Sequence, residues 1–187
     1  MNKVMGMTVV AFAWWSAAAF AATEVEKSCD VAPDCQVVIK NEAGNVQVRT
    51  WDQNRVELKG SLGDKITRLD FDGSGSHVNI EVVAPHRRHS LFPSFRPSID
   101  EEKVKSYLTI SVPKGASLNV ETISADATFK GVAGEIEAST ISGDLTIEDA
   151  VNSVCADSVS GDVEVLANGP SATIKTISGD IDVAGKI

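Results

Sequence analysis

Positive charge is scarce in this 187-residue chain, which has 17 Lys and Arg residues against 26 Asp and Glu and a formal net charge of −9. Such an acidic surface argues against binding to nucleic acid and against electrostatic docking on anionic lipid. Histidine and cysteine are also rare, with three of each, and no catalytic constellation stands out. Helical periodicity is almost absent, which argues against an α-helical fold.

The first 21 residues have the features of a secretory signal peptide. Lys3 precedes an apolar run over residues 4–20, and Ala19-Phe20-Ala21 fits a small-x-small cleavage site. An uncleaved membrane anchor is the alternative, since the run is just long enough to be marginal. No cysteine follows the run directly, which argues against a lipoprotein anchor. We therefore expect an exported protein of the periplasm or cell surface, with no stable membrane anchor after cleavage.

Two of the three cysteines lie close together near the start of the mature chain. Cys29 and Cys35 are separated by a stretch that contains Pro33 and Asp34, which help the chain to turn back. We predict a disulfide between them, as an oxidising compartment would allow. Two free thiols or a metal pair are the alternatives, but no second Cys or His pair lies nearby to complete a zinc site. Cys155 is left unpaired and is interpreted as an ordinary coil residue.

Strand signals dominate the rest of the chain. Residues 36–40 and 45–49 flank Asn41-Glu42-Ala43-Gly44, which predicts a β-hairpin. Further short strands are expected at 56–59, 66–71, 78–83 and 107–112. The predicted fold class is all-β: after a signal peptide at 1–21, an N-terminal short-strand β region at 22–115 continues into a β-solenoid at 116–187.

A basic, proline-broken loop is predicted at residues 85–105. Three prolines interrupt regular structure there, and the residues of interest are His86, Arg87, Arg88, His89, Phe92, Phe95 and Arg96. Loops of this length are usually functional or disordered. A mobile loop between two strands, a docking loop for an acidic partner or envelope lipid, and a metal site through the two histidines remain open. The metal site has too few visible ligands.

The last third of the chain repeats itself every 18 residues. Ile123-Ser124-Ala125-Asp126 recurs at 141–144, 159–162 and 177–180 without an insertion. A fixed short period is typical of a solenoid, in which each repeat is one coil stacked on the previous one. The turn residues of the three later copies are Ser142, Gly143, Asp144, Ser160, Gly161, Asp162, Ser178, Gly179 and Asp180.

Stacking the coils produces columns of similar residues. Three apolar columns are expected to face inward: Ile123, Ile141, Val159 and Ile177; Ala127, Leu145, Val163 and Ile181; and Phe129, Ile147, Val165 and Val183. The polar column between the last two is expected to face outward, as strand alternation requires: Thr128, Thr146, Glu164 and Asp182. A second, looser row nine residues later predicts two short strands in each coil, with successive coils about 4.8 Å apart.

The corner residues of the repeat have predicted roles. We expect each glycine to adopt a positive φ, with the flanking Ser and Asp bonded to local backbone. Asp126, Asp144, Asp162 and Asp180 then form a ladder of carboxylates. Neighbouring carboxylates in water would repel by about 1 kcal/mol. A row of calcium ions is the alternative, but nonapeptide calcium repeats need more glycine than this chain has. No cofactor is expected.

Two hydroxyl columns run beside this ladder: Thr122, Thr140, Ser158 and Thr176, and Ser124, Ser142, Ser160 and Ser178. Together with the carboxylates they are expected to form a flat, hydroxyl-rich, acidic strip. One interpretation is structural filling of the solenoid. The other is a repetitive surface for carbohydrate or another extended ligand.

Three sequence segments occur in order: Ala43-Gly44-Asn45-Val46-Gln47-Val48 with Trp51-Asp52, then Leu108-Thr109-Ile110-Ser111-Val112-Pro113-Lys114-Gly115, then the Ser-Gly-Asp repeats. In this order, from about residue 37 to the C-terminus, the chain resembles a bacterial family of β-strand-repeat proteins that is carried as a domain of unknown function. The resemblance implies an exported β-repeat protein, with adhesion proposed as its role. It implies no catalytic residues.

The end of the chain departs from a capped solenoid. It stops at Ile187, partway into the fourth coil, whereas solenoids normally end in a cap. Either the chain is a short member or a fragment, or the open edge self-associates with another copy.

The leading functional hypothesis is a non-enzymatic structural or binding module of the cell envelope, adhesin-like, with an envelope or extracellular protein or carbohydrate as its partner. A periplasmic scaffold or stress-sensing accessory protein that uses the basic loop is a second hypothesis. A carbohydrate-active β-helix enzyme is a third, but it needs a local cluster of acids and bases that departs from the repeat. All three histidines lie outside the coils.

Overall fold

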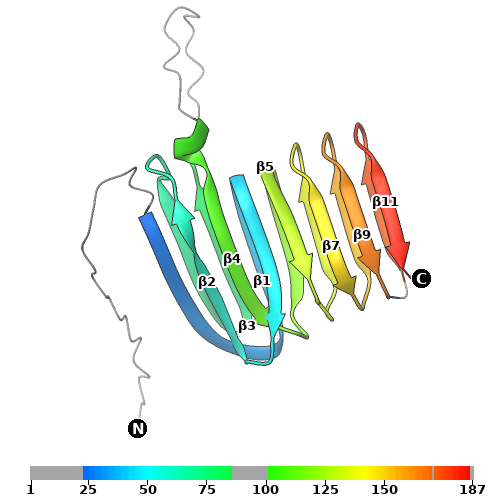
Figure 1. Cartoon of the computed structure of the whole chain (residues 1–187). Coiled ribbons are helices and arrows are strands. Elements are labelled where there is room, and N and C mark those ends of the chain that lie inside the picture. Colours follow the sequence, from blue (N-terminus) through cyan, green and yellow to red (C-terminus); the bar gives the residue numbers. More distant parts are fainter. Residues whose placement is uncertain (1–22, 86–100, 170, 186–187) are drawn as a thin grey trace, which may run out of the picture.

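The computed structural model describes residues 23–85, 101–169 and 171–185 (Figure 1). Within these ranges the one helical segment is the short 3-10 helix η1 (Glu101–Val104). The predicted all-β class is confirmed. The strands are β1 (Thr23–Trp51), β2 (Arg55–Leu62), β3 (Arg68–Val83), β4 (Ser106–Pro113), β5 (Ser117–Lys130), β6 (Ile136–Thr140), β7 (Leu145–Ala150), β8 (Val154–Ser158), β9 (Val163–Ala167), β10 (Ala172–Thr176) and β11 (Ile181–Gly185).

Each 18-residue repeat forms one coil of two short parallel-stacked strands, as the sequence predicts. The first half of β5 pairs with β6, which pairs with β8, which pairs with β10. The second half of β5 pairs with β7, and β9 and β11 follow in the same way. The labelled strands of this second face lie side by side in Figure 1. The solenoid therefore has two faces, joined by corners at the Ser-Gly-Asp turns.

Strand β1 is a coil of the same stack and not one arm of a hairpin. Its residues 36–41 pair in parallel with 117–122 of β5, and residues 43–49 pair with 124–130. The hairpin predicted around Asn41–Gly44 is therefore wrong, because the two flanking segments lie on different faces. Gly44 has a φ of 116°, a left-handed conformation that favours glycine, and a Cβ there would collide with the backbone of Ser106.

Strands β2, β3 and β4 surround the N-terminal coil. β2 pairs antiparallel with the first part of β1 and with β4, while β3 and β4 pair in parallel with later parts of β1. The four further strands expected from the sequence fall within or overlap these three. All eleven strands belong to one sheet, which runs through the predicted domain boundary after residue 115. That division into domains stays a prediction.

The core lies between the two faces of the coils. The columns that contain Ile147 and Leu145 are buried in the inner coils, as predicted, and the opposite face contributes Ile136, Ala138, Val154 and Ala156. In the last coil, Ile181 and Val183 are exposed, although their counterparts one coil earlier are buried. Burial thus comes from stacking, and self-association through this exposed strand stays a prediction.

Candidate binding groove

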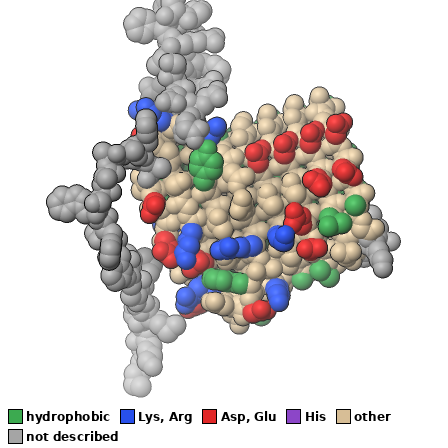
Figure 2. Space-filling model, in the orientation of Figure 1, with side chains coloured by type: hydrophobic (Ala, Val, Ile, Leu, Met, Phe, Trp, Pro, Cys, Tyr) green, Lys and Arg blue, Asp and Glu red, His purple; other side chains and the backbone are tan. Residues whose placement is uncertain are grey.

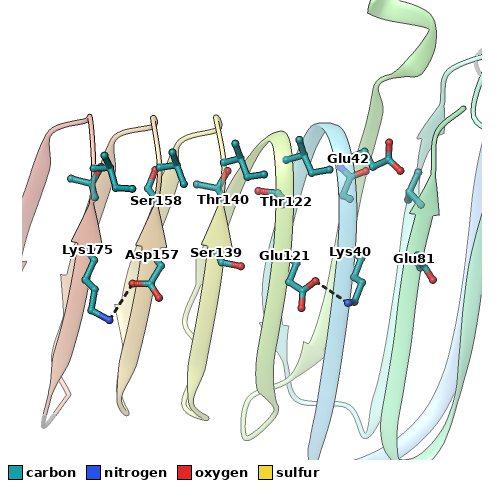
Figure 3. Close-up of a pocket in the computed structure, with 17 residues that line it drawn as sticks. Lys40, Glu42, Glu81, Glu121, Thr122, Ser139, Thr140, Asp157, Ser158 and Lys175 are labelled. Atoms are coloured by element: carbon teal, nitrogen blue, oxygen red, sulfur yellow. Dashed lines mark hydrogen bonds and ion pairs between the residues drawn. The ribbon is translucent and has the colours of Figure 1, made fainter. Parts of the chain in front are cut away.

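A groove of about 690 Å³ crosses the coils beside one row of corners (Figure 3). It runs over β3, β1, β5, β6, β8 and β10, so it lies across the strands and not along them. Its residues come from three neighbouring columns of the stack: an aliphatic wall, a floor of hydroxyl groups and a charged wall. No histidine or cysteine is among the described residues that line it.

The aliphatic wall is the column that the sequence predicts to be buried. Ile123, Ile141, Val159 and Ile177 are 47%, 52%, 43% and 82% exposed. The prediction that this column faces inward is therefore wrong. We call these four residues the aliphatic ladder. Aliphatic side chains that repeat in an exposed row are the kind of surface that marks an interaction site.

The floor is the hydroxyl column one residue earlier, which the sequence analysis placed on the surface. Thr122, Thr140 and Ser158 are only 5%, 4% and 5% exposed, so that prediction is also wrong. The corner explains the inversion. Thr140 Oγ1 accepts a hydrogen bond of 3.0 Å from the Gly143 amide, and Ser158 Oγ accepts one of 2.9 Å from Gly161. These bonds hold the hydroxyl inside the corner, and strand alternation then turns the next residue outward.

Three polar atoms of the groove have no hydrogen-bond partner among the described residues. They are Thr122 Oγ1, Thr176 Oγ1 and Asp157 Oδ1. Thr122 precedes Ala125 where later coils have glycine, and its hydroxyl does not make the bond that Thr140 makes. Buried polar atoms without partners are uncommon in folded proteins, and each costs about 1–3 kcal/mol.

The charged wall lies two residues before the aliphatic ladder. Strand register places Glu81, Lys40, Glu121, Ser139, Asp157 and Lys175 in one row across the strands. Lys40 Nζ donates to Glu121 Oε2 at 2.8 Å, and this hydrogen bond, with the carboxylate charge, raises the pKa of Lys40. Lys175 Nζ lies 3.7 Å from Asp157 Oδ1, an ion pair too long for a hydrogen bond. Figure 3 shows both pairs along the same wall.

The carboxylate ladder is present, but its hydrogen bonds differ from those expected. Asp126 Oδ1 accepts from the amide of Asp144 at 3.1 Å, and Asp144 and Asp162 each accept from the next coil at 3.0 and 2.8 Å. These bonds connect successive coils and do not close a local turn. We call Asp126, Asp144, Asp162 and Asp180 the Asp ladder. Figure 2 shows a row of acidic side chains crossing the coils.

The glycines of the repeat are required by contact and not by their φ angles. The positive-φ glycines among the described residues are Gly44, Gly75, Gly131 and Gly185, so the positive φ predicted for Gly143, Gly161 and Gly179 is wrong. Each of the three instead lies against the backbone of the previous coil. A Cβ on Gly143 would collide with the Ala125 carbonyl, and one on Gly161 with the Gly143 carbonyl.

Other predicted site residues lie away from the groove or outside the described part. Cys29, Cys35 and Cys155 are free thiols in this structure, so the Cys29–Cys35 disulfide is not formed and stays a prediction. Burial raises the pKa of both Cys29 and Cys35, and the neighbouring Cys35 raises that of Cys29 further. The signal peptide and the loop residues His86, Arg87, Arg88, His89, Phe92, Phe95 and Arg96 lie outside the described residues.

The described residues contain no group of three or more His, Cys, Asp or Glu side chains placed to hold a metal ion. A search of the same residues for a helix long and apolar enough to cross a membrane finds none. The groove therefore offers apolar contact and two ion pairs, over a buried column of hydroxyl side chains. Within the described chain it shows no nucleophile–base pair.

Sequence reasoning missed the charged wall. Glu121, Ser139, Asp157 and Lys175 follow one another at the 18-residue period, so the column could have been read from the repeat. The signal was a column with three charged side chains and one serine, two positions before the Ile/Val column. Its significance depended on knowing that both columns face outward, whereas the sequence pattern placed the Ile/Val column inward.

Comparison with known proteins identifies the fold. The profile of the Toastrack DUF4097 family matches residues 35–186. A proposed cell adhesion protein from Clostridium sporogenes ATCC 15579 superimposes with a TM-score of 0.62 at 10% identity, covering 89% of this chain and 100% of that one. A proposed adhesin from Bacteroides fragilis NCTC 9343 gives a TM-score of 0.30 at 11% identity over 88% and 98% of the two chains, too low to carry an argument. No curated protein matches the chain.

Proposed function

Because the chain belongs to the Toastrack DUF4097 family, a family of unknown function, we propose from its own geometry that it is an exported, non-enzymatic binding module of the cell envelope. The groove is its binding site. The observation that carries this proposal is the aliphatic ladder, four exposed Ile and Val side chains in one row beside the charged wall. An elongated ligand with one apolar edge would cover the aliphatic ladder, with its polar groups against the charged wall.

Adhesin-like behaviour is consistent with this site. The Clostridium sporogenes protein of the same fold is described as a proposed cell adhesion protein. A solenoid offers each ligand contact once per coil, so weak contacts add along an extended surface. Export is supported by the apolar run and the Ala-rich cleavage motif at residues 1–21.

The binding test compares two matched substitutions. Purified chain is incubated with envelope fractions of the source bacterium, and the retained protein is quantified after washing. Ile141→Asp places a charge in the aliphatic ladder, and Leu166→Asp places one at an exposed position of β9 that does not line the groove. We expect Ile141→Asp to reduce retention at least tenfold while Leu166→Asp binds like the wild type. Equal retention of both variants would show that the groove is not the binding site.

Export is tested separately by protease treatment of intact and permeabilised cells, with the chain followed by antibody. Digestion in intact cells would indicate the cell surface, and digestion after outer-membrane permeabilisation alone would indicate the periplasm. Protection until the cells are lysed would contradict export.

A further inference from the structure

The charged wall carries a row of charge that is complementary to its own reverse. From β3 to β10 it has one residue on each strand: Glu81, Lys40, Glu121, Ser139, Asp157 and Lys175 (Figure 3). The signs are negative, positive, negative, neutral, negative and positive. Reversing the order places a carboxylate opposite each lysine, and the neutral serine opposite the remaining carboxylate. All six residues line the groove.

We propose that the groove binds the same groove of a second copy of this chain. The two copies face each other about a two-fold axis that runs parallel to the strands, between β5 and β6. Such an axis reverses the order of the coils, so that charged wall meets charged wall and aliphatic ladder meets aliphatic ladder. This inference rests on the proposed function and names the partner of the same site. It differs from self-association through the last coil, which would extend the stack and leave the groove open.

The two-fold arrangement gives both lysines a second carboxylate. Lys40 faces Asp157 of the second copy, and Lys175 faces Glu81 of the second copy. Each lysine keeps the ion pair with its own chain, so it lies between two carboxylates. The hydroxyl group of Ser139 faces Glu121 of the second copy and can donate a hydrogen bond to it. The charged wall is therefore self-complementary in this arrangement.

Charge specifies this register against the two nearest alternatives. An axis through β5 would set Glu81 against Asp157 of the second copy, and Glu121 against its own counterpart. An axis through β6 would set Lys40 against Lys175, and Glu121 against Asp157. Like charges placed opposite each other in an interface disfavour both shifts. A displacement of one strand in either direction thus replaces attraction by repulsion.

The aliphatic ladders meet in the same register. Ile123 and Ile141 lie on either side of the axis, so Ile123 of each copy faces Ile141 of the other. Both side chains are about half exposed in the single chain, and pairing would remove their apolar surface from water. The one mismatch is Glu42, which takes the ladder position in β1 and faces Val159 of the second copy.

The row on the other side of the charged wall also matches. Strand register places Val38, Asn119, Glu137 and Cys155 side by side, two residues before the wall. Under the same axis, Asn119 faces Glu137 of the second copy, and Val38 faces Cys155. Within one chain the Asn119 amide donates to Glu137 Oε2 at 3.1 Å, so the same kind of pair can form between copies. Three adjacent rows therefore agree with one axis.

The covered face is large enough for a weak, specific dimer. Strands about 4.8 Å apart and residues about 3.3 Å apart give the face about 29 by 17 Å, or about 1,000 Å² for both copies together. This area is at the lower limit for specific interfaces, so we expect association in the micromolar range. The formal charge of −9 on each copy opposes association. At physiological salt, however, repulsion between charges more than about 8 Å apart is largely screened.

A pair of charge-reversal variants tests the contact between Lys40 and Asp157. Lys40→Glu sets like charges opposite each other in its own dimer, and Asp157→Lys does the same. We expect each variant to raise the dissociation constant of the dimer at least tenfold, measured by sedimentation equilibrium of the purified chain. In a mixed dimer one contact is native and the other has its two charges exchanged. An equal mixture of the variants should therefore associate nearly as tightly as the wild type.

The mixture also controls for damage to the fold. Each variant loses the ion pair within its own chain both alone and in the mixture, so only a contact between copies can restore association. Ile141→Asp should abolish the dimer, and Leu166→Asp, on the other face, should leave it unchanged. A wild-type chain that stays monomeric throughout the micromolar range would overturn the proposal. So would a mixture that associates no more tightly than either variant alone.

Envelope fractions from a strain that lacks this chain separate the inference from the proposed function. Retention of purified chain by wild-type fractions, lost in the deletion fractions and restored by re-expression, supports a second copy as the partner. Retention by the deletion fractions that still depends on Ile141 keeps the groove as a binding site and overturns the second copy as its occupant. A monomeric chain with no Ile141-dependent retention by either fraction would overturn both.

Discussion

Two aliphatic columns run through the same coils six residues apart, but one is buried and the other is exposed. Ile147 and Val165 are buried between the faces, whereas Ile141 and Val159, with the same period and similar side chains, are exposed. The difference arises at the corner, where a Thr or Ser takes the inward position one residue before the aliphatic side chain. The hydroxyl binds the glycine amide at Thr140 and Ser158, whereas Thr122 is buried without that bond. Periodicity therefore assigns residues to columns, and the path of the chain at the corner decides which columns face inward.

The sharpest test replaces one residue from each column. Ile147→Ala removes a fully buried side chain and leaves a cavity, so the free energy of unfolding should fall by about 3 kcal/mol. Ile141→Ala removes an exposed side chain and should change it by less than about 0.5 kcal/mol. Urea unfolding followed by circular dichroism measures both. Equal losses would mean that the aliphatic ladder is part of the core.

A second test concerns the glycine that the corner bond holds. Gly143→Ala would push a methyl group into the Ala125 carbonyl, and overpacking of this kind costs about 2 kcal/mol. Ser142→Ala, at the exposed neighbouring position, is the control and should be close to neutral. Thermal unfolding of the two variants compares them. A neutral Gly143→Ala would show that successive coils lie farther apart at this corner than the structure places them.

The same contrast in burial occurs at the N-terminal edge, where Cys35 is buried and Cys29 is partly exposed. Both belong to or pack against the core, and the pairing of β1 with β3 shifts register between Val31 and Gln36, a stretch that contains Cys35. In protein folded under oxidising conditions we predict that they pair, with one free thiol left per denatured chain by thiol titration. Reduction should then lower the free energy of unfolding by about 2 kcal/mol. Three free thiols in protein isolated without reductant would contradict the pairing.

The smallest expected effect is a difference in unfolding free energy between substitutions of two threonines in the same column. Thr140→Val loses the bond to the Gly143 amide and should cost about 1 kcal/mol. Thr122→Val removes a hydroxyl that has no partner in the described residues, so it should be neutral or slightly stabilising. Denaturant midpoints of the two variants decide the comparison. A similar cost at both positions would indicate a corner bond at Thr122 as well.

Much of the fold was predictable because the repeat is regular. The 18-residue period, two strands per coil, the buried columns of Leu145 and Ile147 and the carboxylate ladder all follow from alternation and spacing. The hairpin at Asn41–Gly44 failed because a solenoid corner and a hairpin turn share the same local signals. Long-range pairing separates them, as between Lys40 and Glu121, which are 81 residues apart. Nothing within the turn itself specifies that pairing.

The candidate site was less predictable, since it depends on which side of the sheet each column faces. An apolar residue beside a threonine is normally assigned to the interior, and at Ile141 the corner reverses that assignment by placing Thr140 inward. The role of the glycines was hidden for a similar reason. A close approach between coils and a positive φ both demand glycine, and the sequence does not distinguish them.

Because the coils stack one on another, the groove lengthens or shortens only in steps of one whole coil. Each 18-residue unit adds one aliphatic rung, one floor hydroxyl and one carboxylate at a fixed step, without changing those already present. Duplicating or deleting a whole unit would lengthen or shorten the site by one rung. Affinity could thus be adjusted by the number of units, with no change in the chemistry of any one of them.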